Sequence, residues 1–166
     1  MKYSFSIPQP LYQFALRSMM SMVAIATLAY PVAAQQASNF GVITLSSPSQ
    51  APQGATRGHT QGSVPLASMA RHDSQGNMCV GFAESEPDHV LNVQDSMGAI
   101  ALRVDSNGGD TTLLVQAENG TIWCGDDAGG STDARVQIGN LTPGNYQVWV
   151  GSFDPGVRYQ YQLHVD

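Results

Sequence analysis

Lysine is almost absent from this chain, and positive charge is scarce throughout. The 166 residues carry seven lysines and arginines against 13 aspartates and glutamates, a formal net charge of −6. Residues 35–166 hold five arginines, no lysine and all 13 acidic residues, a net charge of −8. Such a surface argues against nucleic acid and anionic lipid as partners, since both are bound through basic clusters. Its acidity is compatible with divalent cations, with basic partners, or with solubility alone.

Long hydrophobic runs are also absent, apart from one near the start. Lys2 and Arg17 precede an apolar stretch over 19–30, which Pro31 and small residues up to Ala34 follow. This is the pattern of a signal peptide cleaved after Ala34. A membrane anchor is the alternative, but it needs about 20 apolar residues. We therefore predict a secreted or periplasmic protein with no membrane insertion after cleavage.

Cysteine occurs only twice, at Cys79 and Cys124, both in the part that would be exported. An oxidising compartment favours their pairing. Closing that loop would stabilise the fold by about 4 kcal/mol in the chain-entropy model. A catalytic thiol or half of a metal site are the rival interpretations, but no CxxC motif or second Cys/His cluster accompanies either cysteine.

Helical periodicity is missing after the leader, where apolar residues alternate instead. Ile100, Leu102 and Val104 alternate with Ala99, Ala101 and Arg103, as in a strand with one buried face. Short strands separated by turn signals predict an all-β fold, an antiparallel, jelly-roll-like β-sandwich of about eight short strands. The expected strands are 79–83, 89–94, 99–105, 111–117, 121–124, 135–138, 146–152 and 157–165.

The composition predicts three regions. Residues 1–34 form the signal peptide, 35–77 a flexible Ser/Gly/Gln-rich segment with one strand at 40–45, and 78–166 the β-sandwich domain. Within the second region, 50–62 has turn formers and little to bury, which predicts a mobile loop. Val64, Leu66 and Met69 are expected to attach the following segment to the core.

Residues 110–166 resemble the bacterial pre-peptidase C-terminal domain, a β-sandwich appended to many secreted peptidases. The resemblance rests on an Asn119-Gly120 hairpin, the Asp126-Asp127 pair before a Gly/Ser loop, LTPGNYQVWVGS at 141–152 and YQLHV at 161–165. It implies a non-catalytic binding or stabilising role. The segment before Cys79 contains no catalytic constellation, and the two cysteines lie outside the family pattern, which favours a stapled stand-alone variant.

The aspartates suggest calcium, although no cofactor is required by the sequence. Asp126, Asp127 and Asp133 surround one glycine-rich loop, while Asp105, Asn107 and Asp110 form a second acidic turn. Ca²⁺ binds oxygen ligands of this kind. The alternative is that Asp and Asn side chains cap turns through their own backbone.

Four histidines are the only candidates for a general base: His59, His72, His89 and His164. His89 is the best placed, but no Gly-x-Ser-x-Gly motif accompanies it. No histidine pair has zinc-ligand spacing. We therefore expect a protein that is not an enzyme, with a small hydrolase as a distant alternative.

Trp149 and Gln147 are predicted to share the strand face opposite Tyr146, together with Trp123 in one interpretation. An exposed tryptophan there would stack on a sugar ring or grip an extended chain, whereas a buried one would fill the core. The predicted function is binding of an extracellular polysaccharide or protein. The alternative is a structural or chaperone-like accessory to a separately encoded exported hydrolase.

Overall fold

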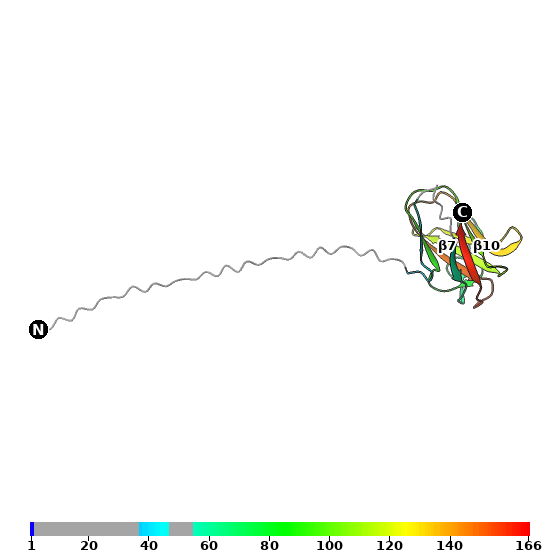
Figure 1. Cartoon of the computed structure of the whole chain (residues 1–166), viewed down its shortest axis with the longest axis horizontal. Coiled ribbons are helices and arrows are strands. Elements are labelled where there is room, and N and C mark those ends of the chain that lie inside the picture. Colours follow the sequence, from blue (N-terminus) through cyan, green and yellow to red (C-terminus); the bar gives the residue numbers. More distant parts are fainter. Residues whose placement is uncertain (2–36, 47–54) are drawn as a thin grey trace. The chain divides into compact units, whose positions relative to one another are not determined.

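The computed structural model describes Met1, residues 37–46 and residues 55–166 (Figure 1). The predicted signal peptide lies outside these residues, as does part of the loop predicted at 50–62. No helix within the described ranges has the length and apolar character needed to cross a membrane. The described residues from Ala37 onward form two β-sheets.

The first sheet, called sheet A here, is built around its longest strand. β11 pairs with β7 from Tyr146 to Ser152, with β5 along its first half and with β4 at its end. β8 extends the sheet beyond β7, β1 beyond β5, and β3 beyond β4. The strands are β1 (Val42–Leu45), β3 (Val64–Pro65), β4 (Phe82–Ala83), β5 (His89–Val93), β7 (Thr111–Ala117), β8 (Ile122–Gly125) and β11 (Gly144–Ser152).

The second sheet, sheet B, runs in the order β2-β12-β6-β10-β9. All four of its pairings are antiparallel. Its strands are β2 (Thr56–His59), β6 (Ile100–Asp105), β9 (Asp127–Ala128), β10 (Ser131–Ile138) and β12 (Gln160–Val165).

The main core lies between the two sheets and is built from the alternating residues. Val148 and Val150 of β11 meet Leu102 of β6 and Leu163 of β12 in one buried cluster. The predicted all-β sandwich is thus confirmed, with one exception to its antiparallel order, because β1 runs parallel to β5. The Asn119-Gly120 hairpin is also confirmed: Gly120 has φ +83° and its N–H donates to the Ala117 carbonyl.

The segment before Asn77 is more structured than its composition predicted. It contains three strands rather than one, and β2 forms where a mobile loop was expected. β2 pairs with the last strand, β12, through Arg57 and Gln162. The predicted boundary between a flexible segment and a sandwich starting at residue 78 is therefore wrong, because both sheets recruit edge strands from the earlier segment.

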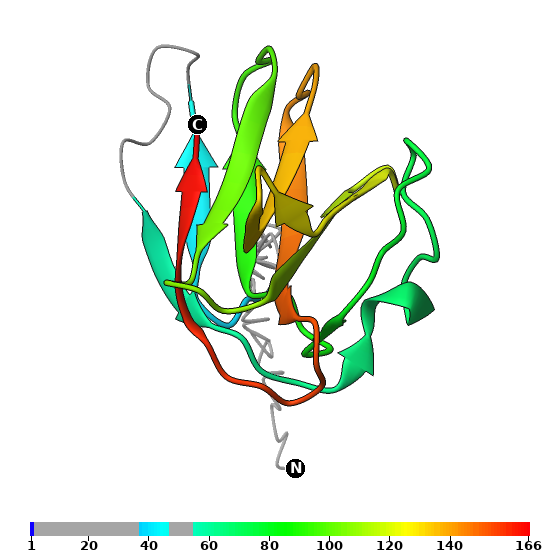
Figure 2. The same ribbon diagram turned by 90° about the vertical axis from the view of Figure 1, so that its right-hand side faces the viewer.

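A second, smaller core covers the outer face of sheet A. After β3 the chain forms a 3₁₀ turn, η1 (Leu66–Ser68), and then a loop that returns to β4 (Figure 2). We call residues 66–81 the strap. Leu66 packs with Leu114, Trp149 and the Cys79–Cys124 disulfide, which confirms the predicted pairing. Because the strap covers this face, β7 is buried on both faces from Thr111 to Val115 instead of showing the expected alternation.

Candidate functional site

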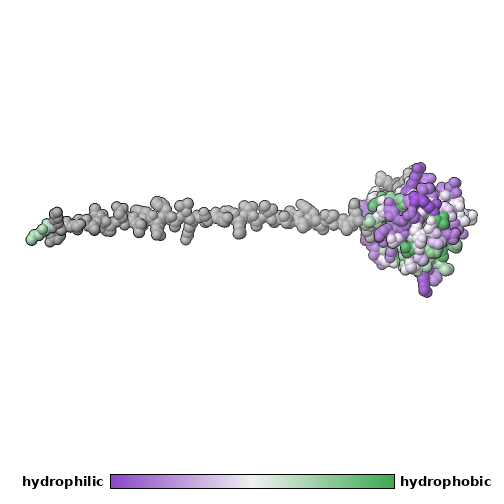
Figure 3. Space-filling view, turned by 90° about the horizontal axis from the view of Figure 1, so that it is seen from below, coloured by the Kyte–Doolittle hydropathy of each residue, from purple (hydrophilic) through white to green (hydrophobic). Residues whose placement is uncertain are grey.

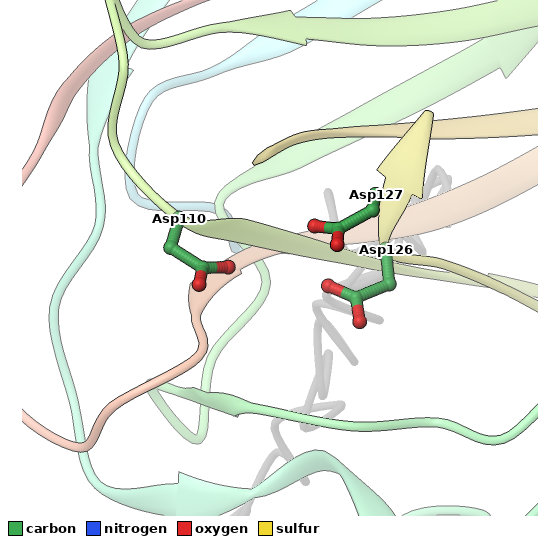
Figure 4. A group of neighbouring side chains, drawn as sticks. All are labelled: Asp110, Asp126 and Asp127. Atoms are coloured by element: carbon green, nitrogen blue, oxygen red, sulfur yellow. The ribbon is translucent and has the colours of Figure 1, made fainter. Parts of the chain in front are cut away.

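Three aspartates, two beside strands of sheet A and one in β9 of sheet B, meet at one point. Asp110 stands directly before β7, Asp126 follows β8, and Asp127 begins β9. One carboxylate oxygen from each lies within 4.8 Å of the other two. Figure 4 shows the three side chains converging from two neighbouring segments. We call these residues the acidic cluster.

The carboxylates of the acidic cluster are poorly compensated. Burial, followed by the charges of Asp127 and Asp154, raises the pKa of Asp110 above its usual range. Burial, followed by the charges of Asp127 and Asp110, likewise raises the pKa of Asp126. The Oδ1 atoms of Asp110 and Asp126 are shielded from solvent and accept no hydrogen bond from the described residues. A hydrogen bond from the Asp127 backbone N–H opposes the shift at Asp126, whereas no such opposing donor acts on Asp110.

A hard divalent cation is the chemistry that suits this arrangement. Ca²⁺ binds oxygen ligands in groups of about six to eight at about 2.3–2.6 Å, and carboxylates supply both charge and ligand atoms. Three carboxylates account for part of such a shell. A bound cation would remove their mutual repulsion and would join β9 to the start of β7.

The sequence predicted two acidic groups, and the structure combines parts of each. Asp110 comes from the second group, whereas Asp126 and Asp127 come from the first. The other three predicted ligands, Asp105, Asn107 and Asp133, lie outside the acidic cluster of the described residues.

These three residues are used in turns. Asp133 accepts hydrogen bonds from the backbone N–H and the hydroxyl of Ser106. Asp105 accepts from the N–H of Asn107, which has the left-handed φ of +57° expected at a turn. Turn capping accounts for the positions of these three residues, and no calcium role is proposed for them.

Trp149 is not an exposed binding platform. Its side chain is only 5% exposed, lies beneath the strap, and donates through Nε1 to the Ser85 carbonyl at 3.4 Å. Gln147 is partly exposed on the same strand. Trp123 faces the main core instead, with its ring centroid 6.2 Å from that of Tyr146. The predicted site at Trp149 and Gln147 thus lacks its aromatic anchor.

The histidines do not assemble a nucleophile site within the described residues. His89 is fully buried, and its Nε2 lies 2.9 Å from the Tyr161 hydroxyl across the two sheets. Burial lowers the pKa of His89 to about 4, so its imidazole is neutral. His59 belongs to β2 and packs edge to face on Phe40, so it is not in a flexible segment as predicted.

Asp88, beside His89, is a buried carboxylate that the sequence did not single out. Its Oδ2 accepts a 2.7 Å hydrogen bond from the N–H of Val150. Val150 lies between Val148, which pairs with β5, and Ser152, which pairs with β4, so Asp88 spans the gap between those two strands. Burial raises the pKa of Asp88 to about 7, against the opposing hydrogen bonds from Val150 and Asn39.

Comparison with known proteins gives a likeness in fold. No protein-family model matches the chain, and a search of curated proteins found no match. Among solved structures, the chain is similar to the pre-peptidase C-terminal domain of collagenase from Bacillus anthracis, with a TM-score of 0.45 and 18% identity. The alignment covers 75% of this chain and 94% of that domain. This similarity concerns the fold alone.

Proposed function

We propose that this protein is an exported, non-catalytic β-sandwich module that binds an extracellular polymer or protein partner, with a divalent cation supporting its loops. The acidic cluster is the observation that carries the cation. Its two shielded Oδ1 atoms have no donor among the described residues, and burial together with the charge of Asp127 raises the pKa of both Asp110 and Asp126. The Cys79–Cys124 disulfide supports export, since such bonds persist in oxidising compartments.

The cation would act on the loops rather than on a reaction. Asp127 belongs to β9, which pairs with β10 through a two-glycine turn at Gly129 and Gly130. Both glycines have positive φ, of +64° and +83°. A cation joining Asp127 to Asp110 would fix this hairpin against the start of β7. A fixed loop loses less conformational entropy when it binds a partner.

Calcium titration followed by thermal unfolding tests the cation. Calcium is expected to raise the midpoint of the wild-type protein, and a free concentration 100 times the dissociation constant would add about 2.7 kcal/mol. Asp126→Asn with Asp127→Asn is expected to abolish that rise and to stabilise the calcium-free protein by relieving repulsion. Asp95→Asn with Glu86→Gln, two exposed acidic residues outside the acidic cluster, is the control for the change in charge. An unchanged wild-type midpoint at millimolar calcium would refute the cation site.

Retention on extracellular polymers tests the binding role itself. The mature protein is mixed with a panel of insoluble polysaccharides and structural proteins, in calcium and in EDTA, and the bound fraction is measured. Retention on at least one polymer is expected. A protein that is folded by its melting curve but retained by no member of the panel would contradict polymer binding and would favour the accessory role beside an exported hydrolase.

A further inference from the structure

Sheet B has a broad polar outer face that the acidic cluster does not use. Its inward residues, such as Leu102, Val136 and Leu163, belong to the main core, so the alternate residues point away from it. The outward residues are Arg57 of β2, Gln160, Gln162 and His164 of β12, Arg103 and Asp105 of β6, and Asp133, Arg135 and Gln137 of β10. Figure 3 shows one side of the molecule, where hydrophilic residues cover much of the described surface.

Two arginines and a histidine stand in one row across this face. Arg135 of β10 pairs with Arg103 of β6, and Arg103 pairs with His164 of β12. Side chains directly opposite on neighbouring strands lie about 4.5–5.5 Å apart at Cβ, and like charges in that position are destabilising. A chain with five arginines after residue 34 thus places two of them side by side at a cost in stability.

Few carboxylates of the protein balance the positive charge of the two arginines. Arg103 Nε lies 3.7 Å from an Asp166 carboxylate, and both side chains are about half exposed, at 41% and 56%. Arg135 has no side-chain ion pair among the described residues. The Nε2 atom of His164 is shielded from solvent and has no hydrogen-bond partner there. Asp133, the nearest carboxylate on β10, is already held by Ser106.

Two surface hollows lie beside the arginines of this face. A hollow of about 270 Å³ is lined by Arg103, Arg135, Asp133, Ser131 and the β9–β10 turn. A second hollow of about 320 Å³ has a mixed lining that includes one carboxylate: Arg57, Asp105, Ser106, Asn107, Gln160, Tyr161 and Gln162. The two flank β6, so one ligand chain crossing the sheet would meet an arginine in each.

We propose that this outer face of sheet B binds a carboxylated polysaccharide, with Arg103 and Arg135 holding one uronate carboxylate and Arg57 the next. This inference rests on the proposed polymer-binding function and names its surface and ligand class. The planar guanidinium fork matches a carboxylate in bidentate geometry. Gln137, Gln160 and Gln162 supply amide donors and acceptors for sugar hydroxyls.

The makeup of the face favours a sugar chain over an acidic polypeptide. Protein interfaces centre on buried apolar and aromatic anchors. The exposed large hydrophobic residues of the described chain are Met1, Val42, Met78 and Phe153, and none is an outward residue of this face.

The test measures binding to soluble polygalacturonate and alginate by affinity electrophoresis, with dextran as the neutral polymer and polyglutamate as the acidic polypeptide. Wild-type protein is compared with Arg103→Gln/Arg135→Gln and with Arg158→Gln plus Arg71→Gln, which makes the same change in charge. Arg158 precedes β12, lines neither hollow and donates to Gln61. The first variant is expected to bind polyuronate at least about tenfold more weakly, as for loss of charge-assisted hydrogen bonds. The control variant should bind polyuronate as tightly as wild type, and dextran should not change the mobility of any of the proteins.

Each other outcome overturns the inference. Equal weakening by both double variants would show a general charge effect. Polyglutamate bound as tightly through the same arginines would make the partner an acidic polypeptide. If the Arg103→Gln/Arg135→Gln variant bound polyuronate more weakly in calcium but not in EDTA, calcium would be bridging carboxylates of the protein to carboxylates of the polymer. Retention on another polymer with no effect of these arginines would overturn this surface but leave the proposed function standing. The melting curve of each variant confirms that it is folded.

Discussion

Asp88 and His89 are expected to give the stability of this protein opposite dependences on pH. Both lie buried at the start of β5, Asp88 at 3% exposure and His89 at 0%. Burial raises the pKa of Asp88 from 3.8 to about 7 and lowers that of His89 from 6.5 to about 4. Glu84 and Tyr161 are the other titratable groups whose charge or contact bears on this pair.

The sign follows from which state binds more protons. Folded Asp88 keeps its proton above pH 3.8 while the unfolded chain loses its own, so stability falls from pH 3.8 to about 7. That loss is about 4 kcal/mol, at about 1.4 kcal/mol per unit. His89 does the reverse: the unfolded chain binds the proton first as pH falls, so about 3 kcal/mol is lost between pH 6.5 and about 4. Between pH 4 and 6.5 the two contributions largely cancel.

Replacing either Asp88 or His89 should reveal the pH dependence of stability that the other residue contributes. Asp88→Asn keeps an oxygen acceptor for the Val150 N–H and leaves His89 in place, so stability should rise by about 3 kcal/mol from pH 4 to 6.5 relative to wild type. His89→Gln keeps a polar partner for Tyr161 and leaves Asp88, so stability should fall by about 4 kcal/mol from pH 4 to 7.

Urea unfolding at several pH values between 4 and 8 measures these slopes. The comparison uses slopes within each protein, so a uniform loss of stability in a variant does not affect it. Asp95→Asn, exposed on a loop, is the control for removing one carboxylate. Parallel pH profiles for wild type, Asp88→Asn and His89→Gln would refute the assigned pKa directions.

Two further predictions concern the strap. Trp149→Ala should lower the free energy of unfolding by about 3–5 kcal/mol, because it removes a buried tryptophan. Gln147→Ala should lower it much less, because Gln147 is partly exposed. Thermal or urea unfolding measures both losses. Equal small losses would place Trp149 at the surface. Cys79→Ala with Cys124→Ala should cost about 4 kcal/mol, because the disulfide spans 45 residues, and free-thiol labelling of the native wild-type protein should find no reactive thiol. Two labelled thiols per chain would contradict the bond.

The sequence predicted the sandwich where alternation is strong. β6, β7, β11 and β12 each carry at least three alternating apolar residues, and all four formed within a few residues of their predicted bounds. β2, β3 and β9 were missed because they have two to four residues each. In β2, TRGH, a glycine takes the inward position and meets the Tyr161 ring, so no apolar pattern marks the strand.

The candidate sites were harder to predict because their residues meet across strands. Asp110 and Asp127 are separated by the β7–β8 hairpin, and only the register of β7 with β8 brings them together. Trp149 was assigned to a wet face because the strap that covers it has no periodic pattern. Arg103 and Arg135 lie far apart in the sequence, and only the pairing of β6 with β10 places them opposite one another.

The two sheets differ in how their outer faces are used: the strap covers that of sheet A, whereas sheet B exposes the paired Arg103 and Arg135. Sheet A is enclosed, because the main core covers one face and Leu66, Trp149 and the disulfide cover the other. Sheet B keeps clean alternation in β10 and β12, with polar residues outward and no second layer among the described residues. A close like-charge pair on the enclosed sheet would be far more costly, since burial weakens screening. The arginines therefore lie on the sheet where solvent tolerates them and where a flat polymer has room to bind.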